Sequence, residues 1–259
     1  MNINSMKALI LTQNDPFFLA SQLDYLFRNL PDGVEIAGCV VFDVSPFGKR
    51  ESFIEKALKT RQIFGNRFFL RYGVKFLMSN LLRFYKLDNL LRKYRIQKIE
   101  IKGNINSKDS IEKLKSFNPD LIISIAGNQI FKKPLIELAP KGCLNLHTSL
   151  LPKYRGLMPS FWVLRNNEKY TGVSVFFVDE GIDTGPLLVK KKVEIGKRTQ
   201  EELIKHTKKL GMDAIIEAIE KIKKGDYDLI PNLDEDSSYY SFPTRDDVKE
   251  FRRMGKKFY

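Results

Sequence analysis

The stretch LNLHTSLLPKYRG, from Leu144 to Gly156, decides the fold because it joins the end of an apolar strand to a long turn. Leu144 and Leu146 alternate with polar residues, as strand residues do when one face of the strand is buried. Asn145 and His147 therefore share the opposite face. Open α/β sheets place their ligands at the carboxyl ends of such strands, so we expect a site at this point.

Apolar runs before and after this stretch predict the other strands of the same sheet. We expect strands at Lys7–Thr12, Val34–Phe42, Gln97–Lys102, Leu121–Ile125, Cys143–His147, Val173–Val178 and Leu187–Ile195. Helices are expected between them, at 17–29, 109–117, 134–138, 159–166 and 199–224. This alternation favours parallel pairing. The predicted fold is therefore a Rossmann-like α/β fold, with an open, twisted, mostly parallel sheet and helices on both faces.

The length of the chain suits one large domain with an appendage. We expect a main domain over residues 1–225, with a basic and aromatic helical insertion at about 49–95. Residues 226–259 are polar and contain Pro231 and Pro243, which predicts a short, extended C-terminal extension.

Composition places the chain among globular proteins, because 43% of its 259 residues are hydrophobic and 12% are aromatic. Cys39 and Cys143 lie within apolar runs, which favours buried, reduced thiols over a disulfide framework. With two cysteines and two histidines in the chain, we expect no metal. The first residues lack the pattern of a signal peptide and no apolar run is long enough to span a bilayer. The expected location is therefore the cytoplasm.

The formal charge of +13 is concentrated in one segment. Between Lys49 and Arg95 there are thirteen basic residues and three acidic ones, a net charge of +10. Because this excess lies away from the expected site, it argues only weakly for a nucleic-acid partner, and none is expected.

A second motif, GIDTG at 181–185, begins nearly forty residues after Asn145. Together with Asn145-Leu-His147, Ser149-Leu-Leu-Pro152 and Arg155-Gly156, it resembles the family of formyltransferases that use N10-formyltetrahydrofolate. That family includes methionyl-tRNA formyltransferase, glycinamide ribonucleotide formyltransferase and the sugar N-formyltransferases. The resemblance is close over about 120–185 and looser elsewhere. It implies the fold predicted above and an enzyme whose formyl donor and co-substrate is N10-formyltetrahydrofolate.

An amide, an imidazole and a carboxylate suit the movement of an acyl group between nitrogen atoms. By resemblance, the catalytic residues are Asn145, His147 and Asp183. The amide and the imidazole can donate hydrogen bonds to the oxyanion of a tetrahedral intermediate, and such donors are each worth about 10²–10³ in rate. Asp183 can orient the amine and relay its proton. Gly181 and Gly185 are expected to allow loop conformations that other residues avoid.

Each of these residues also has a structural interpretation. Asn145 is compatible with a satisfied amide at a strand end, His147 with a structural histidine, and Asp183 with a turn residue. His206, the other histidine, lies in a lysine-rich helical stretch where we expect it to be solvated. The spacing of all three residues together favours the functional interpretation.

The resemblance also implies where the folate binds. It should lie against strand Leu121–Ile125, the loop after that strand and the loop before Asp183. The implied cofactor-binding residues are Asn128, Gln129, Ile130, Asp179 and Gly181.

The expected acceptor is a nucleotide-linked amino sugar of glycan or lipopolysaccharide biosynthesis. The first strand lacks the Gly/Ser-rich phosphate loop expected in the glycinamide ribonucleotide enzymes. The C-terminal barrel domain of the tRNA enzymes does not fit the 35 residues after Lys224. The expected substrate-binding residues are Ser149, Tyr154, Arg155 and Tyr240. The alternatives are an enzyme like methionyl-tRNA formyltransferase and a non-catalytic binding protein on the same fold.

The basic segment at 49–95 departs from the family pattern in length and charge. It interleaves aromatic residues with arginine and lysine, which suits an anionic membrane surface, a nucleic acid, a helical pair packed on the sheet, or the second subunit of a homodimer. Packing is the favoured interpretation, and peripheral membrane contact is a hypothesis.

Overall fold

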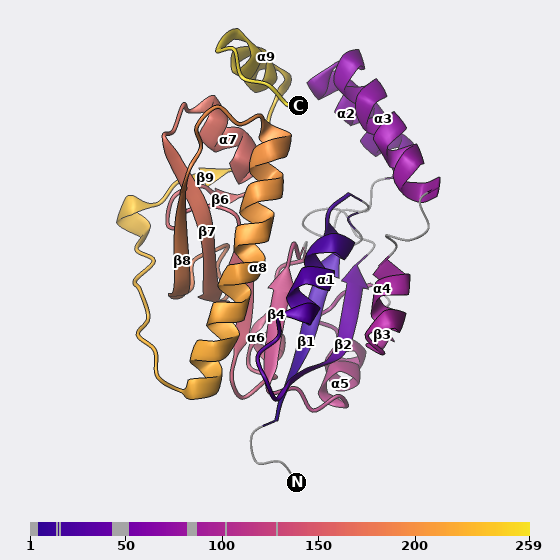
Figure 1. Cartoon of the computed structure of the whole chain (residues 1–259), viewed down its shortest axis with the longest axis vertical. Coiled ribbons are helices and arrows are strands. Elements are labelled where there is room, and N and C mark those ends of the chain that lie inside the picture. Colours follow the sequence, from indigo (N-terminus) through magenta and orange to yellow (C-terminus); the bar gives the residue numbers. More distant parts are fainter. Residues whose placement is uncertain are drawn as a thin grey trace.

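The computed structural model describes residues 5–13, 15, 17–42, 52–81, 87–101, 103–127 and 129–259. Within these residues, seven strands form one sheet (Figure 1). In sheet order they are β3 (Lys98–Ile99), β2 (Val34–Phe42), β1 (Met6–Gln13), β4 (Leu121–Ile125), β5 (Cys143–His147), β7 (Tyr170–Phe177) and β8 (Leu187–Glu194).

The sheet is mostly parallel. Strands β3, β2, β1, β4 and β5 run in one direction. Strand β7 pairs antiparallel with β5, and β8 pairs antiparallel with β7. This arrangement confirms the predicted Rossmann-like α/β fold. Strand β3 is shorter than the predicted Gln97–Lys102, because this edge strand pairs only with Cys39 and Val40 of β2.

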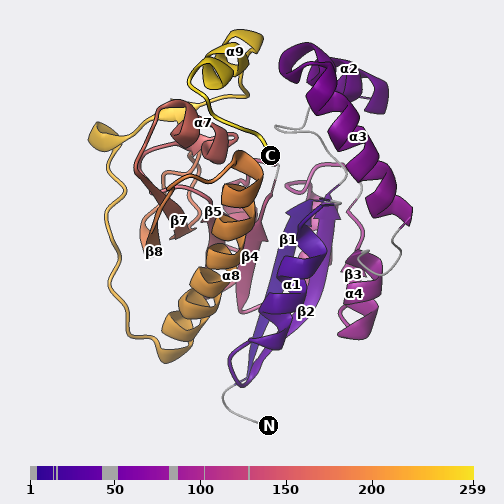
Figure 2. The same cartoon turned by 45° about the horizontal axis from the view of Figure 1, so that its top comes forward.

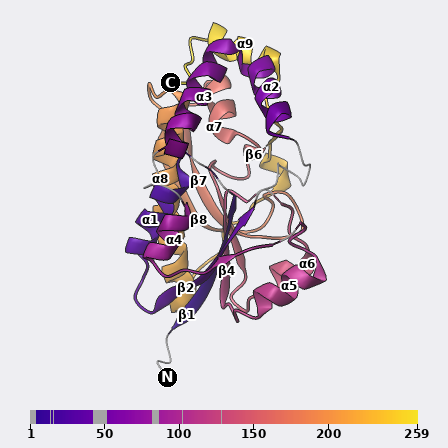
Figure 3. The ribbon, with the colours of Figure 1, turned by 90° about the vertical axis from the view of Figure 1, so that its right-hand side faces the viewer.

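Helices cover both faces of the sheet (Figure 3). Helices α1 (Leu19–Arg28), α4 (Leu87–Lys93) and α8 (Gln200–Lys224) pack on one face. Helices α5 (Lys108–Lys115) and α6 (Lys133–Ile136) pack on the other. Each face of the sheet buries its own cluster of aliphatic side chains, so the sheet lies between two hydrophobic cores.

Helix α8 is positioned by its ends and by one close approach to the sheet. Thr199 and Glu202 form a capping box at its start, and Gly225 ends it with a φ of 71°. A Cβ atom on Gly211 would lie 2.7 Å from Leu146 Cδ2, so the glycine leaves room for this side chain between α8 and β5. The strand that carries Asn145 and His147 therefore packs closely against α8.

Helices α2 (Phe53–Phe64) and α3 (Asn66–Leu81) lie beyond the carboxyl ends of the strands (Figures 1 and 2). Gly65 joins them with a φ of 82°, a conformation that favours glycine. Two of their phenylalanines pack on the C-terminal segment. Phe64 and Phe68 contact Phe258 in this segment, at ring-centroid distances of 5.7 and 5.0 Å.

The C-terminal segment is not the extended appendage that its polarity predicts. It contains a short 3₁₀ helix (Asp234–Asp236), strand β9 (Tyr239–Tyr240) and helix α9 (Arg245–Arg253), and β9 pairs with β6 (Arg155–Gly156). The extended prediction was wrong for α9. Thr244 and Asp247 form a capping box, and Val248 and Phe251 bury one face of the helix.

Candidate active site

A cavity of about 450 Å³ opens at the carboxyl ends of β4 and β5. Asn145, His147 and Asp183 all line it. Its walls also include apolar residues of β4 and of the loops after β4 and β7, and residues of α8. The structure therefore brings the three predicted catalytic residues together in one place, although Asp183 is far from the other two in sequence.

Strand alternation sets the direction of the first two residues. Leu144 and Leu146 belong to the core on the α8 side of the sheet. Asn145 and His147 consequently share the other side of β5, at the end of the strand. His147 is buried, with 7% of its surface exposed, whereas Asn145 is only partly buried.

His147 lies between two oxygen atoms. Its Nε2 atom is 2.7 Å from the backbone oxygen of Tyr154, and its Nδ1 atom is 3.5 Å from Oδ2 of Asp183. A carbonyl oxygen only accepts hydrogen bonds, so Nε2 carries a proton. Nδ1 faces the carboxylate and donates a hydrogen bond only when it carries a proton as well.

Asp183 sits in a strained but supported backbone conformation. Its φ is 56°, a left-handed value that aspartate tolerates better than most residues. The backbone N–H of Gly156 donates to its Oδ2 atom at 2.9 Å. The amide of Asn232 donates to the backbone oxygens of Asp183 and Gly185, both at 2.9 Å.

Sequence reasoning did not identify Asn232. It lies in the polar C-terminal segment, 49 residues after Asp183, and no local motif marks it. Arg155 holds the same segment, because its guanidinium donates to the backbone oxygen of Asn232 at 3.0 Å and to Asp234 at 2.6 Å. Lys208 on the cavity wall was also missed; its Nζ atom lies 2.7 Å from Asp15.

The glycines of the GIDTG loop are required for space. A Cβ atom on Gly185 would lie 1.7 Å from the backbone oxygen of Phe177, and one on Gly181 would lie 1.9 Å from Oγ1 of Thr184. Neither glycine has a left-handed φ. The expected reason, an unusual backbone conformation, therefore applies to Asp183 and not to its glycine neighbours.

The residues expected at the folate have mixed positions. Gln129, Ile130, Asp179 and Gly181 line the cavity, while Asn128 lies outside the described residues. The Gln129 side chain is engaged with the loop before α5, because its Oε1 atom accepts from the backbone N–H of Ile105 at 3.0 Å.

The Asp179 carboxylate holds its own loop. It accepts from the backbone N–H of Gly181 at 3.1 Å and from the Thr184 hydroxyl at 2.5 Å. Ile130, with 47% of its surface exposed, offers an apolar face to a ligand.

The four residues expected to bind substrate lie outside the cavity wall. Ser149 is fully buried, and its hydroxyl donates to the backbone oxygen of Lys153 at 2.8 Å. Arg155 is buried against the C-terminal segment as described above. Tyr154 and Tyr240 stack on each other with ring centroids 5.2 Å apart. These side chains form the framework behind the site, because each is already engaged by the protein.

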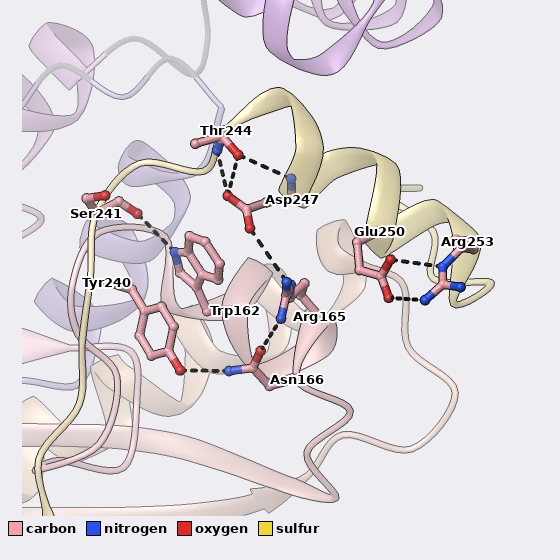
Figure 4. Close-up of polar contacts among 9 residues, drawn as sticks. All are labelled: Trp162, Arg165, Asn166, Tyr240, Ser241, Thr244, Asp247, Glu250 and Arg253. Atoms are coloured by element: carbon pink, nitrogen blue, oxygen red, sulfur yellow. Dashed lines mark hydrogen bonds and ion pairs between the residues drawn. The ribbon is translucent and has the colours of Figure 1, made fainter.

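The same side chains position Tyr154, whose backbone oxygen is bonded to His147. The Tyr154 hydroxyl donates to Glu168 at 2.7 Å, and burial together with this hydrogen bond raises the pKa of Tyr154. Asn166 donates to the hydroxyl of Tyr240 at 2.8 Å (Figure 4). Tyr240 also stacks on α7 (Pro159–Arg165) through Trp162, at 4.7 Å. The carbonyl of Tyr154 is therefore held by a rigid aromatic layer.

Neither cysteine lines the cavity. Burial raises the pKa of the Cys39 thiol to about 12 and also raises that of Cys143, so both remain thiols. Among the described residues, histidine, cysteine and acidic side chains form no group of three that could hold a metal ion. No helix in the described ranges has the length and apolar character needed to cross a membrane.

The arrangement can support acyl transfer to an amine. Asn145 and His147 line the cavity and can offer N–H donors to a carbonyl oxygen that gains charge. Asp183 is an acceptor beside them that can receive a proton from an attacking nitrogen.

The fold and the cavity define a Rossmann-like α/β protein with a ligand site at the carboxyl ends of its strands. Residues 92–219, just under half of the chain, match the family described as Formyl transferase. Asn145, His147 and Asp183 lie inside the matched region, whereas Asn232 lies outside it.

Curated relatives cover part of this chain. Methionyl-tRNA formyltransferase from Thermodesulfovibrio yellowstonii is 47% identical over 116 residues, which are 44% of this chain and 38% of that protein. The chain spans about half the length, or less, of the curated relatives it matches most strongly.

Solved structures share the fold over most of the chain. A sugar N-formyltransferase from a Shewanella species has a TM-score of 0.60 at 18% identity and covers 95% of this chain and 87% of its own. An N-formyltransferase from Helicobacter canadensis, in complex with folinic acid and dTDP-3-aminofucose, has a TM-score of 0.56 at 22% identity. It covers 91% of this chain and 71% of its own.

Proposed function

We propose that this protein is an enzyme that transfers a formyl group from N10-formyltetrahydrofolate to a primary amine. The observation that carries the proposal is the meeting of Asn145, His147 and Asp183 on one cavity. The match of residues 92–219 to the Formyl transferase family supports the same reaction.

The three side chains have separate roles in the proposed reaction. The amine attacks the formyl carbon, and Asn145 and the Nδ1–H of His147 donate to the oxygen that becomes negative. Two such donors in a partly desolvated site contribute about 10²–10³ each. Asp183 holds the amine and then accepts its proton. The bond from the formyl carbon to the folate nitrogen breaks as that nitrogen takes up a proton.

The cavity fits a folate as the formyl donor. Ile125, Ile130 and Val178 supply apolar walls for a planar ring, and the backbone of 126–127 and 179–181 lies at the same wall. A Cβ atom on Gly127 would lie 2.6 Å from the hydroxyl of Ser124, so a residue without a side chain fits at this wall. The folinic acid bound to the Helicobacter canadensis protein supports this assignment.

For the acceptor, we propose a nucleotide-linked amino sugar of glycan or lipopolysaccharide biosynthesis. The dTDP-3-aminofucose bound to the Helicobacter canadensis protein supports this class. Lys208 lies on the cavity wall, where its ammonium group is paired with Asp15. In this proposal Ser149, Tyr154, Arg155 and Tyr240 shape the acceptor site from behind.

A second candidate acceptor is methionyl-tRNA. It is favoured by the 47% identity to methionyl-tRNA formyltransferase over 116 residues, which is a closer sequence match than that of the Shewanella and Helicobacter sugar enzymes. The two candidates share the formyl-transfer chemistry and differ only in what presents the amine.

The test is an absorbance assay of folate deformylation with purified protein, N10-formyltetrahydrofolate and a panel of acceptors. We expect turnover with a dTDP-, UDP- or GDP-linked amino sugar and none with initiator methionyl-tRNA. The opposite preference would select the second candidate. No turnover with any amine, together with tight folate binding, would select the non-catalytic alternative.

The Asp183→Asn variant tests the role of the carboxylate. We expect kcat to fall about 10²–10⁴-fold, because the substituted amide cannot accept the proton. The melting temperature should change little, since the new amide oxygen still accepts from Gly156. Asp236→Asn, an exposed change in the C-terminal segment, is the control. Unaltered turnover in the Asp183 variant would contradict the proposed role.

A further inference from the structure

The outer face of α3 carries a stripe of exposed aliphatic side chains. Leu70, Val74, Leu77 and Met78 are between 56% and 65% exposed. Their spacing of four, three and one residues places them on one side of the helix. We call these four residues the outer stripe. On α2, Ile54 and Leu58 are exposed to a similar degree, at 69% and 59%.

The inner face of α3 is already occupied. Phe68 and Tyr72 stack on each other at 4.2 Å, and Phe68 packs on Phe258. Lys75 forms an ion pair with Glu201 of α8 at 2.9 Å. The helix is therefore apolar on both of its long faces. A surface helix of a globular protein normally has one apolar face, so the outer stripe indicates a binding surface.

Basic side chains outnumber acidic ones around the outer stripe. The described residues 53–81 contain six basic side chains and one acidic side chain, Glu55. Exposed Lys56 and Arg67 lie on these two helices. Helix α9, which packs beside α2, carries four basic and three acidic side chains and so adds little net charge. Helices α2, α3 and α9 lie at one end of the molecule (Figure 2). This end carries the outer stripe and an excess of basic side chains.

We propose that the α2–α3 pair binds the surface of an anionic membrane. In this arrangement the outer stripe enters the boundary between headgroups and acyl chains, and the basic side chains contact the anionic headgroups. Each kind of side chain then has a partner of matching chemistry. The interaction lies apart from the cavity and does not depend on the reaction proposed above.

Two other occupants fit the surface less well. A second copy of the chain, docked by the same face, would bring like-charged helices together, which opposes association. A single-stranded nucleic acid would need aromatic rings for stacking, but Phe64 and Phe68 are buried on the inner face. The exposed apolar side chains here are aliphatic.

Vesicle flotation tests the proposal with the full chain. We expect the protein to float with vesicles of equal parts phosphatidylglycerol and phosphatidylcholine, and not with vesicles of phosphatidylcholine alone. The double variant Leu70→Ser/Leu77→Ser should lower the partition coefficient about tenfold or more. Lys56→Glu/Arg67→Glu should remove the preference for the anionic vesicles.

A matched control is Leu229→Ser/Leu233→Ser, which removes two leucines that are 45% and 56% exposed in the C-terminal segment. Its binding should equal that of the parent. All variants change exposed side chains, so circular dichroism and melting temperature should stay at the parent values. Equal binding of the parent and the Leu70/Leu77 variant, or no binding of the parent, would overturn the proposal.

Sedimentation velocity without lipid distinguishes the second copy. A concentration-dependent dimer of the parent that the Leu70/Leu77 variant fails to form would assign the outer stripe to self-association and overturn the membrane proposal. A gel shift with single-stranded nucleic acid that is lost in Lys56→Glu/Arg67→Glu, without vesicle binding, would do the same.

Discussion

The imidazole of His147 is held by two contacts of different kinds. A hydrogen bond to the carbonyl of Tyr154 fixes a proton on Nε2, and the carboxylate of Asp183 faces Nδ1. Tyr154 has a left-handed φ of 64°, and this turn aims its carbonyl at the ring. The position of the proton on the His147 ring therefore depends on Tyr154, which contributes only its backbone carbonyl.

Asn232 is expected to be a positioning residue for Asp183. Asn232→Ala removes two hydrogen bonds to the backbone of the Asp183 loop, so we expect kcat to fall about tenfold to a hundredfold through misplacement of the carboxylate. KM should change less than kcat, because Asn232 does not line the cavity. Steady-state kinetics with the formyl donor measure both constants.

The exposed Asp236 provides a control in the same segment, and Asp236→Ala should retain the parent kcat. A loss of kcat in both variants would show a general effect of the segment and would contradict a specific role for Asn232.

For single residues, the sequence predicts the positions that follow from local structure. Asn145 and His147 share a face because strand residues alternate, and the family spacing pointed to Asp183. The positions of Ser149, Arg155 and Asn232 depend on contacts between distant segments. Arg155 has the charge expected of a substrate-binding residue, but its guanidinium is hydrogen-bonded to Asp234 and Asn232, which lie far away in the sequence.

Among the elements, α3 and α8 are joined by an ion pair that should respond to pH. Glu201 accepts from Lys75 at 2.9 Å and lies 3.1 Å from Lys205. Burial acts to raise the pKa of Glu201, but the hydrogen bonds from the two lysines outweigh it and lower the pKa below its usual 4.5. Because folding lowers this pKa, the stability it adds is present above pH 4.5 and is lost as the pH falls.

Glu201→Gln should therefore lower the free energy of unfolding by about 1 kcal/mol at neutral pH. The difference from the parent should vanish in acid, where Glu201 is protonated. Urea unfolding across this pH range measures both values. The exposed Glu220→Gln on the same helix is the control and should show no such pH-dependent difference. A difference for Glu201→Gln that persists in acid would contradict the ionic explanation.

Most elements of the sheet could be predicted, because apolar runs and helix caps are local signals. Strands β1, β2, β4 and β5 and helix α8 lie within two residues of their predicted bounds. Helix α9 was missed because its mean composition is polar, and only Val248 and Phe251 reveal its buried face. In the basic segment, alternating aromatic and basic residues did not show which face is buried.

For the molecule as a whole, one aromatic cluster ties α2 and α3 to the C-terminal segment. Phe258 is 6% exposed and contacts Phe64, Phe68 and Phe251. Phe258→Ala should lower the free energy of unfolding by about 3 kcal/mol, as is usual for a buried phenylalanine. Hydrogen exchange in residues 53–81 should increase more than in the sheet, because the helical pair loses its support.

Phe242→Ala is the matched comparison, since Phe242 contacts Phe64 at 5.9 Å but is 43% exposed. Its effect on urea unfolding should be less than half as large. Equal effects of the two variants, or uniform exchange across the chain in Phe258→Ala, would contradict the anchoring role of Phe258.

The division into a domain at 1–225 and an extension at 226–259 stays a prediction. So does the acceptor class, which depends on how a ligand meets the cavity. The fold follows from the alternation of strands and helices along the chain. The contacts of the C-terminal segment with the site do not, because they join residues that no sequence rule relates.

The clasp of Asn232 on the Asp183 loop has a consequence for building hybrid proteins. The matched family region ends at residue 219, yet the loop that bears the carboxylate is fastened by a residue beyond that limit. A chimera that carries only the matched region would contain Asn145, His147 and Asp183 but would lack the hydrogen bonds from Asn232 to the Asp183 loop. A chimera that also includes residues 230–240 would contain Arg155, Asn232 and Asp234 together. We expect it to retain the position of the Asp183 loop.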